Sequence, residues 1–193
     1  VAVLLAAIAL GMSGAAADAV EKGFTPIFNG SDLSGWTVAG EPVGFEVRDG
    51  CIYSDGGKGG NQIRYTAREF GNFVLRMEWM LSKTGNSGIY IRYRVGAGTQ
   101  EIQLLAPWTP YRDDLHCTGS IYGHKAVDKR PDETTLRWRS MEIRAEWKDV
   151  TVSIDGEQVT KANYDAVESM TNLPLVGFIG MQDSHTGPGE WVK

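Results

Sequence analysis

The sequence predicts an all-β fold, and the most economical form of it is a two-layer β-sandwich made of antiparallel sheets. Short segments in which apolar and polar residues alternate recur along the chain, as expected for strands with one buried face. Turn-forming pairs such as Asp49-Gly50 and Asp155-Gly156 separate these segments. Helical signals are sparse, and the 193 residues include 24 glycines.

The first predicted hairpin joins residues 45–47 to residues 51–53 through Asp49-Gly50. A long strand follows over residues 73–79, where every second residue is apolar. Residues 141–147 repeat this pattern, so we expect a second strand with one buried face.

A second hairpin is predicted from residues 150–154 to residues 158–159. Residues 163–170 have the composition of a helical turn or two, and the apolar run over residues 175–180 returns the chain to a strand. We expect three tryptophans, Trp36, Trp79 and Trp147, to lie in the core. The segments 56–60 and 107–131 are predicted to be long loops, which are common places for binding and chemistry.

The N-terminal segment has the pattern of a secretory signal peptide. An apolar run over residues 1–10 is followed by Ala15-Ala16-Ala17 and then Asp18. We therefore expect residues 1–17 to be a signal peptide, clipped at its N-terminus, and residues 18–193 to form a single domain. The apolar run is too short to span a bilayer, so the mature protein is predicted to be periplasmic or secreted.

Charge and cysteine content narrow the range of functions. Acidic residues outnumber basic ones by 24 to 19, giving a net charge of −5, so nucleic acid is a poor candidate partner. Cys51 and Cys117 are far apart in sequence, and we expect them to be unpaired. Neither the cysteines nor the histidines have the spacing of a tetrahedral zinc site.

Two neighbouring strands each carry a hydrogen-bonding face. Tyr90, Arg92 and Arg94 alternate with less polar residues, and Glu101 and Gln103 alternate with isoleucine and leucine. A sheet face with a carboxylate, an amide, a guanidinium and a phenol suits a sugar, because it can meet several hydroxyl groups at once. The alternative is an ordinary solvated face of an antiparallel sheet.

Further polar and aromatic residues follow these strands and favour a binding site. They occur in the loop after Gln103 and near the end of the chain: Trp108, His116, Tyr122, His124, Lys125, Gln182, Asp183 and His185. A tryptophan in such a loop is suited to stacking on a sugar ring, although Trp108 has the alternative of packing its own loop.

Several motifs, in their order along the chain, resemble the 3-keto-disaccharide hydrolase family. They are Phe24-Thr25-Pro26-Ile27-Phe28-Asn29-Gly30, Asp32-Leu33-Ser34-Gly35-Trp36, Asn86-Ser87-Gly88-Ile89 with Arg92, Glu101-Ile102-Gln103, Thr118-Gly119-Ser120-Ile121-Tyr122, Trp138 before Met141-Glu142-Ile143, and Ile179-Gly180-Met181-Gln182-Asp183. The resemblance covers nearly all of residues 24–191. It implies a concanavalin-like jelly roll and an exported enzyme acting on glycosides oxidised at C3. The family continues with a closing strand, so we expect this chain to lack its C-terminal strand.

The sequence also suggests a mechanism. A conventional retaining glycosidase needs two carboxylates about 5 Å apart, whereas the strand face here has Glu101 followed by Gln103. A 3-keto sugar needs one base, because its ketone acidifies the C2 proton and permits β-elimination; water then adds back. We expect His124 or His185 to be the base, with Glu101 binding hydroxyls or orienting the histidine.

The remaining roles keep their alternatives. Arg92 or Lys125 is expected to stabilise the enolate, although Arg92 has the alternative of a structural ion pair with Glu101. The predicted substrate-binding residues are Tyr90, Arg92, Gln103, Trp108, Tyr122, Lys125, Gln182 and Asp183. No cofactor is required, and Asp183 offers an oxygen ligand for calcium. A non-catalytic, lectin-like carbohydrate-binding domain and a conventional glycoside hydrolase are the alternative functions.

Overall fold

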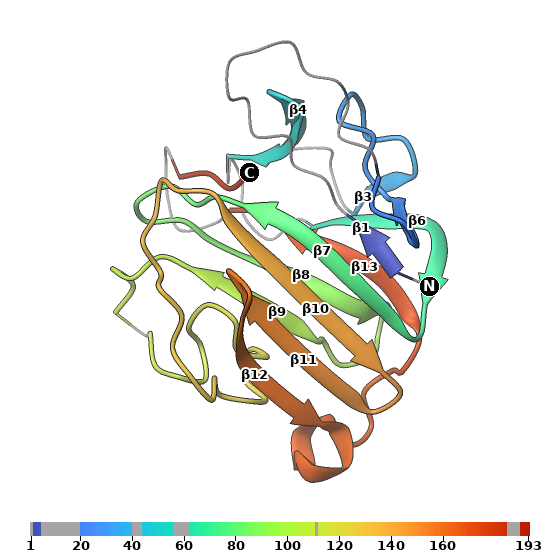
Figure 1. Ribbon diagram of the computed structural model, residues 1–193, viewed down its shortest axis with the longest axis vertical. Coiled ribbons are helices and arrows are strands. Elements are labelled where there is room, and N and C mark those ends of the chain that lie inside the picture. Colours follow the sequence, from blue (N-terminus) through green and yellow to red (C-terminus); the bar gives the residue numbers. More distant parts are fainter. Residues whose placement is uncertain (1, 5–19, 40–43, 56–61, 111, 185–189) are drawn as a thin grey trace.

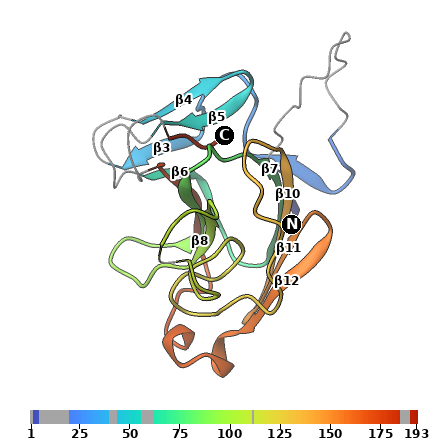
Figure 2. The ribbon, with the colours of Figure 1, turned by 90° about the vertical axis from the view of Figure 1, so that its left-hand side faces the viewer.

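The protein is a β-sandwich of two packed sheets with a short hairpin at one end (Figures 1 and 2). The computed structural model describes residues 2–4, 20–39, 44–55, 62–110, 112–184 and 190–193. The strands are β1 (Ala2–Leu4), β2 (Phe24–Pro26), β3 (Trp36–Ala39), β4 (Phe45–Arg48), β5 (Cys51–Ser54), β6 (Gln62–Phe70), β7 (Phe73–Trp79), β8 (Asn86–Tyr93), β9 (Glu101–Leu105), β10 (Arg139–Glu146), β11 (Asp149–Ile154), β12 (Glu157–Asn163) and β13 (Gly177–Gln182).

One sheet has the strand order β12-β11-β10-β7-β1-β2, and the other has the order β3-β6-β13-β8-β9. Strands β4 and β5 form a separate hairpin that covers one end of the sandwich (Figure 1). All strand pairs are antiparallel except those of β1, which runs parallel to both β2 and β7. The predicted sandwich is therefore confirmed, with β1 as the exception to a purely antiparallel arrangement.

The core lies between the two sheets and is built by the alternation seen in the sequence. Every second residue of β7, from Phe73 to Trp79, is buried, and Ile143 of β10 faces Leu75 across the strand pair. The opposite sheet contributes Ile89 and Ile102, which are also paired. Burial of these side chains stabilises the fold by roughly 1.5–3 kcal/mol for each large apolar residue.

The predicted hairpins are confirmed. Residues 45–48 pair with residues 51–54, and the two turn residues have positive φ angles, 54° at Asp49 and 74° at Gly50. Two positive φ angles define the turn that matches the twist of a two-residue hairpin. Residues 149–154 pair with residues 157–163 around a similar turn.

The segment after β12 forms two 3-10 helices of three residues each, Tyr164–Ala166 and Glu168–Met170, as the predicted turn or two. No helix in the described part of the chain has the length and apolarity needed to cross a membrane. Both cysteines are unpaired and buried, as expected.

Two predictions about individual side chains are wrong. Trp147 is not in the core: it follows the end of β10 at a hairpin turn, has a φ of 50° and is 65% exposed. Trp36 and Trp79 are buried as expected. The second error concerns Arg92, which does not share the face of Tyr90.

A β-bulge in β8 explains the position of Arg92. Tyr90 pairs with Gly180 and Tyr93 pairs with Phe178, so β8 uses three steps where β13 uses two. Arg92 takes the extra position with a φ of 50°, and its side chain is fully buried. Its Nε donates to the Gly71 carbonyl at 3.0 Å. Because a bulge shifts the alternation by one residue, the guanidinium points away from the polar face.

The two ends of the chain bear on the remaining predictions. Residues 2–4 form β1, which lies inside the segment assigned to a signal peptide. At the other end, Val192 is buried and exchanges backbone hydrogen bonds with Ser54 at 3.0 and 2.9 Å. Signal-peptide cleavage, the domain boundary at residue 18 and the missing closing strand stay predictions.

Candidate functional site

A polar pocket of about 260 Å³ opens on the outer face of the β3-β6-β13-β8-β9 sheet. It is lined by Asn86, Glu101, Gln103, Tyr122 and Gln182. These residues come from β8, β9, β13 and the segment after β9. The inward residues of the same strands fill the core, so alternation alone sends the polar side chains to this face.

Glu101 is the central ionisable group of the pocket. The residue is 8% exposed, and Oε1 has no hydrogen-bond partner in the described part of the protein. Burial raises its pKa from 4.5 to about 7, because removing the carboxylate from water disfavours the charged form. At neutral pH the protonated and ionised forms are therefore both populated.

Gly88 makes room for the carboxyl group. A Cβ atom at this position would lie 2.0 Å from Glu101 Oε1 and 2.5 Å from Glu101 Cγ. Gly88 is directly opposite Gln103, and Tyr90 is directly opposite Glu101. The Glu101 side chain thus lies over a glycine of the neighbouring strand, and any larger residue there displaces it.

Amide side chains surround the carboxyl group. Gln103 Nε2 donates to Asn86 Oδ1 at 3.0 Å, and Gln182 Nε2 donates to the Tyr90 hydroxyl at 3.2 Å. Gln182 Oε1 is buried without a hydrogen-bond partner among the described residues. Burial raises the pKa of Tyr90 and keeps its hydroxyl protonated. An acceptor without a partner and a set of oriented amides suit a ligand with several hydroxyl groups.

Tyr122 forms the rim of the pocket on a segment that pairs with the edge of β9. Its backbone N–H donates to the Glu101 carbonyl at 2.9 Å, and its side chain is partly exposed. The His116 ring meets the Tyr122 ring edge-on, with centroids 4.8 Å apart. His116 Nδ1 is 2.8 Å from Asp113 Oδ1, and this contact lowers the pKa of Asp113.

His124 and Lys125 do not join this pocket. His124 Nδ1 contacts the Ser169 hydroxyl at 2.8 Å, and Nε2 contacts the Thr99 carbonyl at 3.1 Å. A carbonyl only accepts, so Nε2 donates to Thr99, and both ring nitrogens are engaged in contacts outside the pocket. Lys125 Nζ binds the Asp128 carboxylate and the Ala126 carbonyl. The expected base and enolate-stabilising roles of this pair are not supported by their contacts.

Arg92 is also absent from the pocket lining, because the bulge buries it on the opposite side near the ring of Tyr164, 5.6 Å from Arg92 Cζ. The prediction of an ion pair with Glu101, given as an alternative, is wrong, because the guanidinium lies next to the Gly71 carbonyl and the Tyr164 ring. His185 lies outside the described residues.

Asp183 is fully buried and is not among the residues lining the pocket. Its negative charge contributes to raising the pKa of Tyr90. In the described part of the chain, no group of three or more histidine, cysteine, aspartate or glutamate residues is arranged to hold a metal ion. Calcium binding by Asp183 has no support from these contacts.

Trp108 lies apart from the Glu101 pocket. It is 72% exposed and borders a second cleft, which shares no lining residue with the first. Asn86, which lines the Glu101 pocket, and Gly88, which lies against the Glu101 side chain, were not predicted as site residues. The signal for them was their alternation with Tyr90 on the strand that faces Glu101.

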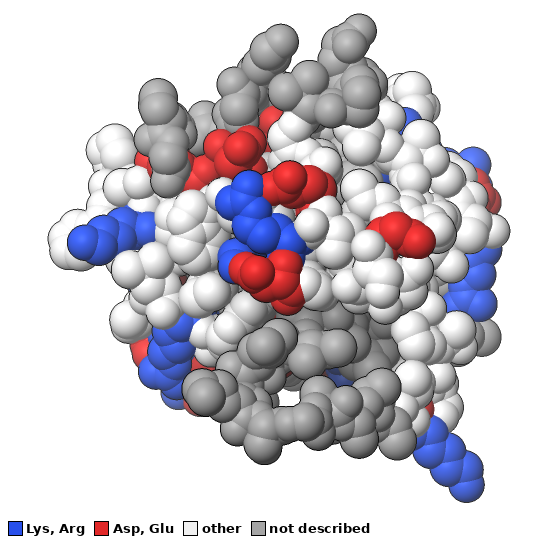
Figure 3. Space-filling view, turned by 90° about the horizontal axis from the view of Figure 1, so that it is seen from above, with Lys and Arg blue, Asp and Glu red and all other residues white. Residues whose placement is uncertain are grey.

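The charged side chains near β4 and β5 are mixed in sign. Figure 3 shows acidic and basic residues next to each other at the centre of this end of the molecule. Ion pairs of this region include Lys193 with Asp49 at 2.8 Å. The Glu101 pocket differs from this charged surface, because its carboxyl group is buried and its neighbours are mostly amide side chains.

The fold and the pocket define a jelly-roll β-sandwich with a polar site on the outer face of one sheet. The model of the 3-keto-alpha-glucoside-1,2-lyase-like domain matches residues 23–192. The chain therefore belongs to this family, as the sequence motifs indicated.

Known proteins similar to this chain agree with the assignment. A 3-keto-disaccharide hydrolase from Bacteroides thetaiotaomicron is 40% identical over 79 residues, covering 35% of this chain and 27% of that protein. The match thus spans about a quarter of the curated relative's length.

Solved structures support the fold. A protein from Parabacteroides distasonis, named "putative glycosyl hydrolase", has a TM-score of 0.74 at 21% identity, over 88% of this chain and 95% of that one. A carbohydrate-binding module from Bacillus subtilis has a TM-score of 0.57 at 10% identity, over 86% of this chain and 94% of that one. At these identities the likeness shows a shared jelly-roll fold.

Proposed function

We propose that this protein cleaves the glycosidic bond of 3-keto-glycosides by β-elimination followed by hydration, with Glu101 as the base. The observation that carries the proposal is a buried carboxyl group, with a pKa of about 7, in a polar pocket. Family membership and the name of the Bacteroides relative support a hydrolase acting on glycosides.

The chemistry needs one base of near-neutral pKa. The C3 ketone acidifies the C2 proton, so the ionised Glu101 carboxylate removes that proton and an enolate forms at the C3 oxygen. The enolate then reforms the ketone, the C1–O bond breaks, and the leaving group takes up a proton. Water adds across the resulting C1–C2 double bond, giving a 3-keto sugar and the free second product. A base with a pKa near the working pH is efficient in such a proton transfer.

Other pocket residues supply binding and charge stabilisation. Gln103 has a second amide hydrogen besides the one it donates to Asn86, and Tyr122 carries a hydroxyl at the rim. In the proposed mechanism either donor stabilises the enolate oxygen. The free Gln182 Oε1 accepts a hydrogen bond from a sugar hydroxyl.

A conventional glycosidase mechanism fits this pocket less well. Retaining and inverting enzymes both require a pair of carboxyl groups, about 5 Å apart in the retaining case. Among the described residues that line the pocket, Glu101 is the sole carboxylate. Gln103 occupies the next position on the same strand face and does not titrate.

The proposal is tested with a 3-keto-glucoside and its unoxidised parent in deuterated water. Product release and deuterium entry at C2 are followed by NMR for the wild type, Glu101→Gln and Glu78→Gln. Glu78 is a matched control, because burial also raises the pKa of this glutamate but it does not line the site. We expect turnover of the keto form alone, exchange at C2, and a loss of at least about 100-fold in Glu101→Gln only.

Three outcomes would contradict this proposal. Release of sugar from the unoxidised parent without exchange at C2 would indicate a conventional glycoside hydrolase. Binding of both compounds without turnover, in the wild type, would indicate a lectin-like carbohydrate-binding domain. Unchanged turnover in Glu101→Gln would remove this residue as the base.

We also propose that the protein is exported to the periplasm or beyond the cell. The support is the apolar run over residues 1–10 followed by Ala15-Ala16-Ala17. Expression in a Gram-negative host, fractionation and N-terminal sequencing test this proposal. A mature protein starting at Asp18 in the periplasmic fraction is expected, and an uncleaved chain in the cytoplasm would contradict it.

A further inference from the structure

A second cleft lies beyond the end of β9, separate from the Glu101 pocket. It is open to solvent, and the space within and above it amounts to about 700 Å³. Its walls come from two segments that are distant in sequence: Pro107, Trp108 and Arg112 on one side, and Pro131, Asp132, Glu133, Thr134 and Thr135 on the other. The cleft therefore joins an aromatic ring with charged and hydroxyl side chains.

Trp108 is the most exposed tryptophan among the described residues, at 72%. A single exposed apolar side chain is ordinary on a protein surface. Here, however, the indole borders a cleft that is also lined by two prolines and by charged and hydroxyl side chains. An indole ring combines a large apolar face with an N–H donor, which matches the C–H face and the hydroxyls of a sugar ring.

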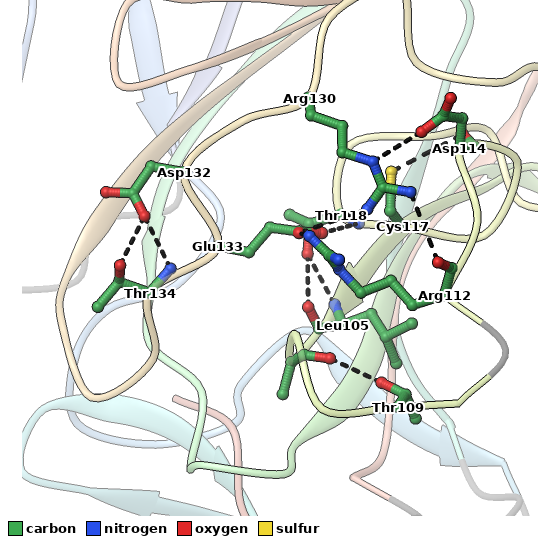
Figure 4. A network of polar contacts seen from close by, with 11 residues as sticks. Leu105, Thr109, Arg112, Asp114, Cys117, Thr118, Arg130, Asp132, Glu133 and Thr134 are labelled. Atoms are coloured by element: carbon green, nitrogen blue, oxygen red, sulfur yellow. Dashed lines mark hydrogen bonds and ion pairs between the residues drawn. The ribbon is translucent and has the colours of Figure 1, made fainter.

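The polar floor of the cleft is rigid. The Glu133 side chain is almost fully buried, and its carboxylate pairs with Arg112 and accepts a hydrogen bond from the Thr118 backbone N–H at 3.2 Å. Figure 4 shows Arg112 and Glu133 pointing toward each other, with Thr118 beside them. The Thr118 hydroxyl in turn donates to the Leu105 carbonyl at 2.9 Å. These contacts hold the Arg112 guanidinium in place at the cleft wall, so that its binding to a ligand costs little conformational entropy.

One donor in the floor is left over. Arg112 Nε is buried and has no hydrogen-bond partner among the described residues, although the same guanidinium pairs with Glu133 through Nη2. A hydroxyl group in the cleft is a suitable acceptor for a guanidinium N–H. The cleft thus provides a stacking ring and a hydrogen-bond donor together.

Strand β9 supports both sites. It carries Glu101 and Gln103 in the first pocket, and the chain continues from Leu105 into Pro107 and Trp108 of the cleft. At a rise of about 3.3 Å per residue, the four residues from Gln103 to Pro107 span roughly 13 Å. A glycoside of two or three rings is long enough to cover such a distance.

We propose that the Trp108 cleft is an accessory subsite for an unoxidised sugar ring of the substrate, so that the protein prefers glycosides of two or more rings. This inference rests on the proposed function for the identity of the substrate. The Trp108 ring stacks on the C–H face of the second sugar, and Arg112 donates to one of its hydroxyls.

The test compares Trp108→Ala with Trp147→Ala in the full-length protein. Trp147 is a matched control, since it is 65% exposed but lies at the β10–β11 turn and does not line either site. Steady-state turnover is measured with a methyl 3-keto-glucoside, which has one ring, and with a 3-keto-disaccharide. We expect Trp108→Ala to raise KM for the disaccharide about tenfold, with kcat and the one-ring substrate unchanged, and Trp147→Ala to alter neither.

Equal effects of Trp108→Ala on both substrates, or no effect on either, would overturn the subsite while leaving the proposed function intact. If the wild type turns over neither compound, the proposed function fails, and calorimetric binding of the unoxidised disaccharide decides the subsite. Weaker binding by Trp108→Ala than by Trp147→Ala would then support a sugar site in the cleft. Equal affinities, or no binding by the wild type, would overturn it.

Discussion

Replacing Glu101 with glutamine is expected to stabilise the fold above neutral pH. Burial raises the pKa of this carboxyl group from 4.5 to about 7 in the folded protein. Folding therefore favours the protonated form. The stability contributed by the neutral carboxyl group is fully present below pH 4.5 and is lost as the pH rises through 7.

The size of the effect follows from the two pKa values. They differ by about 2.5, and each unit corresponds to about 1.4 kcal/mol, so ionised Glu101 lowers the free energy of unfolding by about 3 kcal/mol. Glutamine has nearly the same shape and never carries this charge. At pH 8 the variant should be more stable than the wild type by that amount, which is roughly 6 to 12 °C in Tm for a domain of this size.

Thermal and denaturant unfolding of the wild type, Glu101→Gln and Glu78→Gln at pH 4, 6 and 8 measures this difference. The gap between the wild type and Glu101→Gln should be small at pH 4 and grow up to pH 8. Glu78 is more exposed, so its variant should show a smaller trend. A Glu101→Gln variant that is no more stable than the wild type at pH 8 would refute the idea that burial destabilises the ionised carboxylate.

Three other substitutions test the arrangement of the site. Gly88→Ala places a Cβ atom 2.0 Å from Glu101 Oε1, so kcat/KM should fall at least about tenfold with an unchanged circular dichroism spectrum. The control is Gly71→Ala, whose Cβ atom would meet its nearest side chain at 3.4 Å, and it should keep full activity. His124→Ala loses two hydrogen bonds and should lower the free energy of unfolding by about 1–2 kcal/mol while turnover stays within about twofold; a large loss of kcat would restore this histidine as a candidate base. Arg92→Ala removes a fully buried side chain and should lower the free energy of unfolding by about 3 kcal/mol in denaturant, with normal turnover per folded molecule. A raised KM or a lowered kcat in the folded variant would show that the guanidinium contacts the substrate.

The sequence was sufficient to predict the strands and one side of the site, because both depend on a period of two. Residues 73–79 and the two hairpins have the predicted alternation and turns. The same alternation correctly placed Tyr90, Glu101 and Gln103 on the face opposite the core. These features are local, and local patterns are what a single sequence records.

Arg92 and Trp147 were misplaced because the period breaks at each of them. Both have a φ of 50°, which is uncommon for residues other than glycine, and the neighbouring residues do not predict this conformation. At Arg92 the bulge depends on the register with β13, which includes Gly177; a Cβ atom there would lie 2.4 Å from the Arg92 carbonyl carbon. Long-range pairing of this kind is not visible in the local pattern.

The sequence also did not predict the path of the loop after β9. Tyr122 reaches the pocket because its backbone pairs with Glu101, whereas His124, two residues later, is held by Ser169 and Thr99. Tyr122 and His124 are close in sequence, but these contacts direct their side chains to different parts of the structure. The position of His124 in the sequence therefore did not show that its side chain lies outside the pocket.

Gln103 stands where a second carboxylate would share the strand face of Glu101, and an amide at this position suits the single-base mechanism proposed above. A carboxylate at position 103 would lie on the same face of β9 as Glu101, and the repulsion between two like charges would raise the pKa of one of them further. The amide avoids this repulsion and is held by Asn86 at 3.0 Å. Burial alone then sets the pKa of Glu101 at about 7, where the carboxylate is both populated and basic enough to remove a proton next to a ketone. The same burial destabilises the ionised form, so the gain in stability expected for Glu101→Gln and its expected loss of turnover have one physical cause.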